Sequence, residues 1–244
     1  MQESIFDDPG LFGRLWADTY DLDEPDPQPA VDFLAGTAAT GPALELAIGT
    51  GRVALPLAAR GLTVDGVEAS PEMVAKLRAK DGGADLDVVI GDMADVGVQG
   101  PYALVYLVYN TLFNLVREQR QRDCFRNVAR VLAPGGAFVI ETFVPDRAGF
   151  DHDERVQVRE VTEDSATIRL HKYDRAAQTF IRQNIRFDAG GVHLAPFAMR
   201  YCWPEQIDEM AHAAGLRLTE RYAGWDRQAF DTTSKSHVSV YRRD

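Results

Sequence analysis

Between residues 43 and 140 the sequence alternates short apolar runs with segments of helical periodicity, and this alternation strongly constrains the fold. Apolar runs between helical segments are typical of parallel strands whose two faces are both covered by helices. Such strands are joined by right-handed crossovers. We therefore predict a doubly wound α/β fold. The expected strands are 43–48, 62–68, 86–90, 103–109 and 136–143, and the expected helices are 53–60, 71–80 and 117–132.

After residue 144 the period of the pattern changes to two, which predicts an antiparallel β meander. The meander is too short to hold a core of its own, so its apolar face is expected to lie against the α/β body or a second copy of the chain. A helix and two strands then return the chain to a mostly parallel, seven-stranded sheet. The expected meander strands are 156–162, 166–174, 179–188 and 192–202, followed by a helix over 204–214 and strands near 216–223 and 236–242.

The domain organisation follows from these patterns. Residues 11–20 form a short amphipathic segment, and the proline-rich acidic stretch 21–29 is expected to be a connector without helix or strand. Pro56 lies inside an expected helix, so we expect a bend there. The four predicted parts are an N-terminal lid helix and linker (1–29), a nucleoside-binding core (30–143), an antiparallel insertion that acts as substrate lid or dimer contact (144–202), and a C-terminal helix with the last two strands (203–244).

The net charge and the cysteine content limit which classes of ligand and partner this chain is expected to bind. The 244 residues carry 26 Lys and Arg against 37 Asp and Glu, a net charge of −11 that repels nucleic-acid phosphates and anionic membrane surfaces. A small-molecule substrate is therefore expected, with no nucleic acid and no membrane. The N-terminus lacks the features of a secretory signal, which favours a cytoplasmic protein. Cys124, Cys202 and the histidines lack metal-ligand spacing, so no metal site is expected.

A glycine-rich turn follows the first expected strand. Gly49 and Gly51 in LELAIGTGRVA let the backbone approach a ligand beside the start of a helix. The same stretch satisfies GxGxxA, which dinucleotide sites share with other nucleoside sites. Glu68, Asp92 and Tyr109–Asn110 follow the second, third and fourth strands. Because ligands of open α/β sheets bind at the carboxyl ends of the strands, these residues are expected to converge.

These residues resemble the class I S-adenosylmethionine (SAM)-dependent methyltransferases. ELAIGTG is similar to the first motif of that family with Ala47 at its first glycine, VEASPEM to the second-strand acid and helix, GDM to the third-strand Asp, and LAPGGAFVIE to the fifth strand. The resemblance spans residues 11–143 and implies a Rossmann-like fold, with SAM as cofactor and S-adenosylhomocysteine (SAH) as product. Within that family the chain is most similar to the small-molecule N- and O-methyltransferases, a group that includes glycine N-methyltransferase and the aminosugar N-methyltransferases. This narrower resemblance depends on ADTYD, the meander and WPEQIDEMAHAAGL.

The resemblance assigns roles along the cofactor. Glu68 is expected to accept the ribose hydroxyls, a task that suits a carboxylate, and Asp92 the adenine amino group. Glu45 is expected near the methionine amine, and Tyr20 is expected to close over the methionine end. The full set of expected cofactor residues is Tyr20, Glu45, Ala47, Gly49, Gly51, Glu68, Ala69, Met73, Asp92, Met93 and Tyr109.

On the substrate side no residue is identifiable as an obligatory base. Methyl transfer from a sulfonium needs mainly alignment of the nucleophile. The resemblance implies that the acceptor is a nitrogen or oxygen of a small metabolite, as in bacterial natural-product pathways. The arginines between residues 117 and 130 are interpreted as the solvated face of a helix. The candidate substrate-facing residues are Asn110, Glu141, Arg200, Tyr201, Trp225 and His237.

Two other functions fit parts of the pattern. GxGxxA followed by an acid would permit an NAD(P)-dependent oxidoreductase, although the acid before the glycine turn and the GDM motif speak against it. A non-catalytic SAM-binding module is the other alternative, because no nucleophile or base stands out. A homodimer formed through the meander is also plausible from the sequence.

Overall fold

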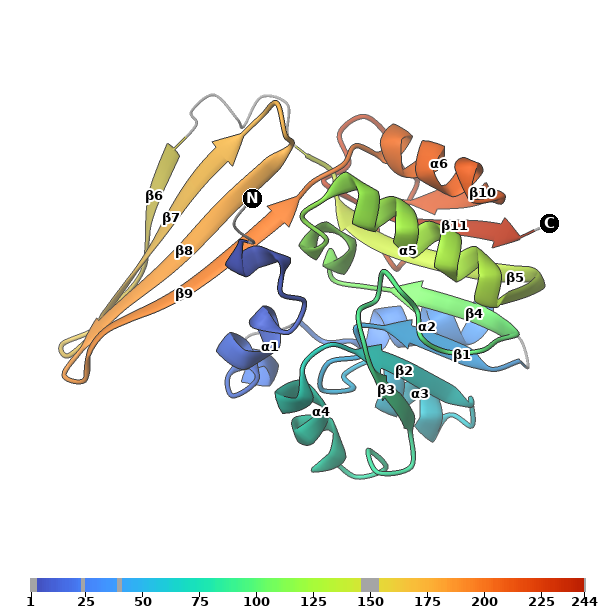
Figure 1. Cartoon of the computed structure of the whole chain (residues 1–244), viewed down its shortest axis with the longest axis horizontal. Helices are drawn as coiled ribbons and strands as arrows, with labels where there is room; N and C mark the ends of the chain where they lie inside the picture. Colours follow the sequence, from blue (N-terminus) through green and yellow to red (C-terminus); the bar gives the residue numbers. More distant parts are fainter. Residues whose placement is uncertain (1–3, 23–24, 39–40, 146–153, 244) are drawn as a thin grey trace.

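The computed structural model describes residues 4–22, 25–38, 41–145 and 154–243. Seven strands form one sheet in the order β10-β11-β5-β4-β1-β2-β3 (Figure 1). β1 to β5 pair in parallel, and β11 is antiparallel to both of its neighbours. The predicted doubly wound, mostly parallel sheet is confirmed. Its strands are β1 (Ala43–Leu46), β2 (Val64–Glu68), β3 (Asp87–Ile90), β4 (Tyr102–Leu107), β5 (Leu132–Phe143), β10 (Leu216–Tyr222) and β11 (Ser236–Arg243).

Two apolar layers cover this sheet because its central strands are apolar on both faces. In β5, Phe138 and Ile140 belong to the layer under α5 (Glu118–Val131) and α6 (Pro204–Ala213). Ala137 and Val139, the alternate residues, belong to the layer under α2 (Gln28–Thr37) and α3 (Ala54–Ala59). Alternate side chains of a strand point to opposite faces, so a strand buried on both sides reads as a continuous apolar run.

Two local predictions about helices are corrected. α2 begins at Gln28, inside the stretch interpreted as a connector, because Pro27 and Pro29 lie at the start of the helix, where a backbone N–H is not needed. Ala30, Val31, Phe33 and Leu34 then bury one face of α2. α3 begins at Ala54, so Pro56 lies in its first turn and removes no helical hydrogen bond. The reason to expect a bend at Pro56 is therefore absent.

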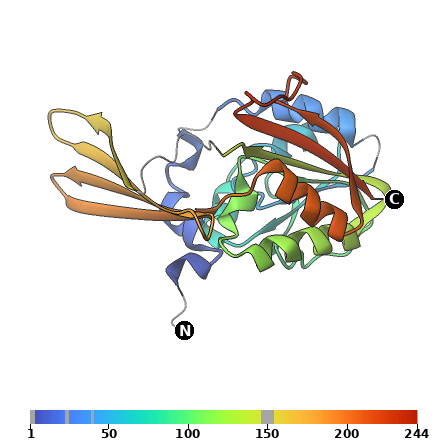
Figure 2. The ribbon, with the colours of Figure 1, turned by 90° about the horizontal axis from the view of Figure 1, so that it is seen from above.

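The meander forms a separate four-stranded antiparallel sheet, in the order β6-β7-β8-β9, that projects from the body (Figures 1 and 2). Of the two places expected for its apolar face, the α/β body is wrong, since Val156, Val158, Val192 and Leu194 are 59–70% exposed, and a second copy of the chain stays a prediction. Phe180 and Met199, on the opposite face, contact the core instead. The strands are β6 (Glu154–Val161), β7 (Ala166–Asp174), β8 (Thr179–Asp188) and β9 (Gly191–Arg200).

The remaining short elements lie around the carboxyl ends of the parallel strands. The N-terminal segment holds η1 (Ile5–Asp7), α1 (Leu11–Trp16) and η2 (Tyr20–Leu22) and runs beside β9 and α4 (Pro71–Arg78) (Figure 1). η3 (Thr111–Asn114) follows β4. No helix of the described ranges has the length and apolar character needed to cross a membrane.

Candidate active site

The turn after β1 has a left-handed backbone at three positions. Ala47, Gly49 and Gly51 have φ angles of 54°, 58° and 77°. Gly51 suits glycine because its φ is left-handed and because a Cβ atom there would lie 2.3 Å from the end of the Leu77 side chain. Ala47 adopts a conformation that costs a non-glycine residue on the order of 1 kcal/mol or more. The turn is thus held in a strained conformation at the carboxyl end of β1.

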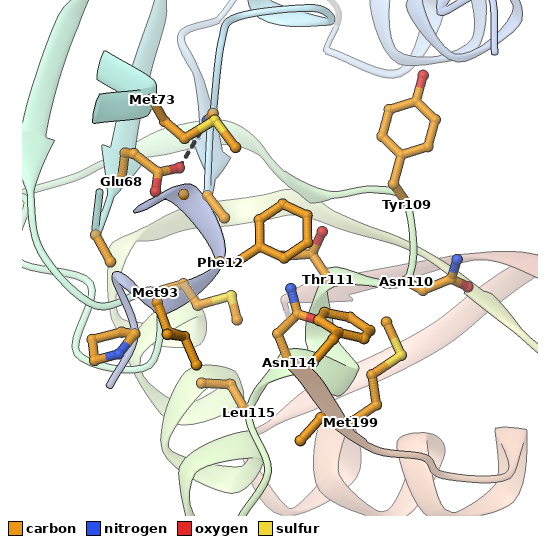
Figure 3. A pocket seen from close by; sticks show the side chains of 18 of the residues that line it. Phe12, Glu68, Met73, Met93, Tyr109, Asn110, Thr111, Asn114, Leu115 and Met199 are labelled. Carbon is orange, nitrogen blue, oxygen red and sulfur yellow. Dashed lines mark hydrogen bonds between the residues drawn. The ribbon is translucent and has the colours of Figure 1, made fainter. Parts of the chain in front are cut away.

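A cavity of about 530 Å³ lies between the carboxyl ends of the parallel strands, the N-terminal segment and β9 (Figure 3). Its size is within the range of small-molecule sites. The residues predicted from separate strand ends do converge, although their roles stay predictions. The predicted residues that line the cavity are Tyr20, Ala47, Gly49, Glu68, Ala69, Met73, Asp92, Met93, Tyr109, Asn110 and Glu141.

Glu68, at the end of β2, ties the glycine turn to the start of α4. Its carboxylate accepts hydrogen bonds from the backbone N–H of Gly49 at 2.8 Å (Figure 3) and of Ser70 at 2.9 Å. The side chain is buried, and this desolvation raises the pKa of the Glu68 carboxyl against the opposing effect of the backbone hydrogen bonds. Each carboxylate oxygen keeps a second lone pair, so the group remains able to accept ligand hydroxyls.

Asp92 is oriented by an arginine that the sequence pattern did not reveal. It accepts hydrogen bonds from the backbone N–H of Ala94 and from the guanidinium of Arg120, both at 2.8 Å. Arg120 also donates to Asp95. The interpretation of the α5 arginines as a merely solvated face is therefore wrong for Arg120, which fixes a cavity-lining carboxylate.

Glu45 lies beneath the glycine turn and does not line the cavity. It is 3% exposed and accepts a hydrogen bond from the Tyr106 hydroxyl at 3.0 Å. Burial is the main cause that raises the pKa of this carboxyl to about 8. Gly51 likewise lies in the turn outside the lining. Glu45 thus supports the turn from below. The resemblance placed it near the methionine amine of SAM, and that role stays a prediction.

We expect Glu45→Gln to flatten the dependence of stability on pH. A raised pKa means that the protonated carboxyl contributes stability that is complete below the unfolded pKa near 4.5 and is lost as pH rises through about 8. The wild type should therefore lose on the order of 3 kcal/mol of unfolding free energy between pH 5 and pH 9, and the variant much less. Urea unfolding at several pH values measures this. The same replacement at the exposed Glu209 should leave the profile as in the wild type.

Glu141, on β5, positions the loop after β4. Its carboxylate accepts hydrogen bonds from the Tyr109 backbone N–H at 2.8 Å and from the Trp225 indole N–H at 2.9 Å. Tyr109 and Asn110 both have left-handed backbones, with φ of 56° and 64°. The side-chain oxygen of Asn110 accepts a hydrogen bond from the Phe143 N–H. Glu141 and Asn110 therefore hold a strained loop at the cavity wall, and Trp225 supports that wall from behind.

The N-terminal segment closes one side of the cavity with aromatic rings. Phe12, which was not predicted, lies 5.9 Å from the ring of Tyr20 and 5.6 Å from that of Phe197 on β9. The Arg52 guanidinium lies 4.9 Å from the ring centre of Tyr109 and 5.7 Å from that of Tyr20. These contacts join segments far apart in the sequence, so no local motif could have announced them.

Three further contacts hold the N-terminal segment in place. Asp21 accepts a hydrogen bond from the Thr50 hydroxyl at 2.6 Å and forms an ion pair with Lys80 at 2.7 Å. Gly13 packs so closely on α4 that a Cβ atom there would lie 2.1 Å from the Ser70 hydroxyl. These contacts hold the segment beside the cavity, and its role as a lid stays a prediction.

Four predicted substrate-facing residues lie outside the lining. Trp225 packs against the ring of Phe33 and donates to Glu141 behind the cavity wall. Arg200 is buried and forms an ion pair with Glu118 at 2.8 Å, and Tyr201 is a core residue. His237 is fully buried between the hydroxyls of Thr142 and Ser239, and burial lowers its pKa to about 3. Arg200 and His237 point into the body because neighbouring residues of a strand alternate between its faces. The described residues contain no group of acids, histidines or cysteines able to hold a metal.

Comparison with known proteins identifies the family. A family model for a methyltransferase domain matches residues 43–136. The structure of the CcbJ methyltransferase from Streptomyces caelestis is 39% identical, covers 97% of this chain and 99% of its own, and superposes with a TM-score of 0.87. This chain is a methyltransferase. The methyltransferase reading explains why the strand-end acids and the glycine turn meet at one cavity, and it removes the reason to consider an oxidoreductase.

More distant relatives agree. The cypemycin N-terminal methyltransferase of a Streptomyces species is 26% identical over 97% of this chain and 99% of its own. SAM-bound CalS10, an amino pentose methyltransferase from Micromonospora echinaspora, is 21% identical over the whole of both chains, with a TM-score of 0.69, and shares the fold. The resemblance to SAM-dependent methyltransferases stated from the sequence is confirmed, and SAM is the cofactor of this methyltransferase.

Proposed function

We propose that this methyltransferase transfers the methyl group of SAM to a nitrogen atom of a small molecule. The observation that supports nitrogen is the state of the acids around the cavity. Each carboxylate in the described lining (Asp8, Glu68, Asp92 and Glu141) accepts a hydrogen bond from a backbone N–H group. The described lining contains no histidine.

This arrangement suits an amine better than an alcohol. A carboxylate whose lone pairs already accept hydrogen bonds from the protein is less available to take a proton from the acceptor. Glu68 has a raised pKa, but it lies beside the glycine turn, where the resemblance places the ribose. An amine that has lost its proton to solvent attacks without a protein base, whereas an alcohol requires one in the transition state.

The SAM sulfonium supplies an excellent leaving group, so the protein has mainly to align the two reactants. We propose that Glu68, Gly49 and Asp92 hold the nucleoside end, and that Tyr20 with Phe12 excludes water from the opposite end. Asn110 and the Tyr109 backbone, fixed by Glu141, then present the acceptor. Alignment of this kind contributes up to about 7–11 kcal/mol to lowering a barrier.

Relatives give a direction for the acceptor. The cypemycin enzyme is named as an N-terminal methyltransferase, and KedS8 from a Streptoalloteichus species as a sugar N-methyltransferase. For this chain, an acceptor amine made in a bacterial natural-product pathway is the corresponding proposal, and a cytoplasmic location accompanies it.

The dependence of rate on pH tests nitrogen as the acceptor atom. An acceptor found by screening amines with isotopically labelled SAM would be compared with its β-fluorinated analogue, whose ammonium pKa is lower. We expect the rising limb of kcat/KM against pH to move down with the pKa of the acceptor, and mass spectrometry to find the label on nitrogen. A limb at the same pH for both amines, or a methylated oxygen, would contradict the proposal.

A further inference from the structure

The face of the four-stranded sheet that borders the cavity carries a row of cationic and aromatic side chains. Arg155, His171, Arg182 and Phe197 are directly opposite one another across β6, β7, β8 and β9. Directly opposite residues of antiparallel strands share a face. Phe197 and Arg182 line the cavity, and the Arg182 guanidinium lies 4.5 Å from the Phe197 ring centre. The row therefore leads from the cavity wall outward along the sheet.

The neighbouring row adds a third arginine. Arg169 on β7 lies opposite Asn184 on β8, and its guanidinium donates a hydrogen bond to the Asn184 side-chain oxygen at 2.8 Å. Residues 169 and 171 are two apart on one strand, so they point to the same face. Within the described ranges no ion pair joins Arg155 or Arg169 to a carboxylate. Each of the two donates instead to a neutral amide, Arg169 to Asn184 and Arg155 to Gln157.

The positive charges on this face change the pKa of His171, which lies among them. Burial and then the positive charges of Arg182, Arg169 and Arg155 lower the pKa of His171 to about 4. The ring is therefore neutral at physiological pH, and the Nδ1 atom of His171 is buried without a hydrogen-bond partner in the described chain. A concentrated positive field on one face of a chain whose net charge is −11 favours an anion at that face.

We propose that this cationic row, Arg155, Arg169 and Arg182 around His171, binds an oxyanion of the acceptor, so that the acceptor is an amine carrying a carboxylate or a phosphate. The inference rests on the proposed N-methyl transfer. The planar fork of an arginine matches two oxygens of a carboxylate or phosphate. Arg182 makes the first contact at the cavity wall, with Arg169 and Arg155 adding charge behind it.

The rest of the cavity reinforces this orientation. Its described lining carries four carboxylates, Asp8, Glu68, Asp92 and Glu141, and Arg182 is its one cationic residue. An acidic group of the acceptor is disfavoured beside these carboxylates and attracted to Arg182, whereas the amine end of the same molecule is tolerated near the carboxylates. The acceptor is thus turned with its acid toward Arg182 and its nitrogen toward the glycine turn.

Calorimetry with matched amines on the SAH-loaded enzyme tests the proposal by binding alone. One pair is 4-(aminomethyl)benzoate and its carboxamide, and the other is phosphoethanolamine and ethanolamine, so the two pairs distinguish carboxylate from phosphate. In at least one pair we expect the acid to bind ten times more tightly or better. Arg182→Gln should remove that preference and leave the neutral probe unchanged, whereas Arg182→Lys should retain part of it.

Arg186→Gln is the matched control, because Arg186 lies on the same strand near the hairpin end and pairs with Asp188 at 3.0 Å. It should behave as the wild type. If Arg182→Gln fails to fold, Arg155→Gln and Arg169→Gln take its place, each with a smaller loss. Equal binding within both pairs, no binding of either acid, or a preference that survives in the arginine variants would overturn the proposal. An acid preference without methylation of any amine would instead contradict the proposed function alone.

Discussion

Deletion of residues 1–22 is expected to lower kcat/KM by about 100-fold or more, because the deletion opens the cavity to water and removes Phe12 and Tyr20 from its wall. The melting temperature should fall by only a few degrees, since Gly13 is the single buried residue of α1 and the ion pairs of Asp18 and Asp21 are exposed at least in part. Steady-state kinetics and calorimetric melting measure the two effects.

A single substitution tests the contact between α1 and α4 without removing the rest of the segment. Gly13→Ala places a Cβ atom 2.1 Å from the Ser70 hydroxyl and should displace α1 from α4, with a loss of activity in the same direction. Gly36→Ala is the matched control, because the space around Gly36 on α2 is open for 4 Å. If deletion and Gly13→Ala reduce stability as much as activity, the segment is a structural helix and the lid role is refuted.

Replacement of Glu68 by alanine should weaken SAM and SAH binding by roughly 10- to 100-fold, or about 1.5–3 kcal/mol, through the loss of charge-assisted hydrogen bonds. The structure adds that the same carboxylate holds the Gly49 and Ser70 N–H groups, so the unfolding free energy should also fall, by about 1–3 kcal/mol. Calorimetric titration well below the melting temperature measures the affinity.

Two variants control for that result. Glu68→Gln keeps the shape and one accepting oxygen, and it should bind with intermediate affinity. Asp65→Asn changes an acid of the same strand that accepts a hydrogen bond from Tyr102 outside the cavity, and it should bind SAH as the wild type does. Unchanged affinity in Glu68→Ala would exclude this carboxylate from the cofactor site.

The fold could be predicted wherever periodicity and turn residues coincide. The bounds of β7 and β8 agree with the sequence prediction to the residue, because Asp164–Ser165 and the turn after Asp174 interrupt a regular alternation. α2 was missed because its prolines and acids hide a short apolar face. Packing of the apolar face of the four-stranded sheet against the body, one of the two alternatives expected, was also wrong, since alternation shows which residues share a face and not which face meets the body.

The site could be predicted only in part, for a similar reason. Strand ends of a parallel sheet meet at one edge, so Glu68, Asp92 and Glu141 could be placed together from the sequence. Arg52, Arg120 and Arg182 reach the site or its lining acids from other elements, and only the folded chain brings them there. His237 lies near a strand end, yet its side chain enters the packed interior, which position alone did not reveal.

The place of β11 between β5 and β10 has a consequence for folding order. β10 precedes β11 in the chain, but it joins the sheet only through β11, whose pairing with β5 spans about a hundred residues. During synthesis, a chain that has emerged only as far as β10 presents β5 as an uncovered edge, open to association with other nascent chains. Residues 236–243 therefore cover the edge of β5 only after β10 has been made, and they complete the sheet in the same step.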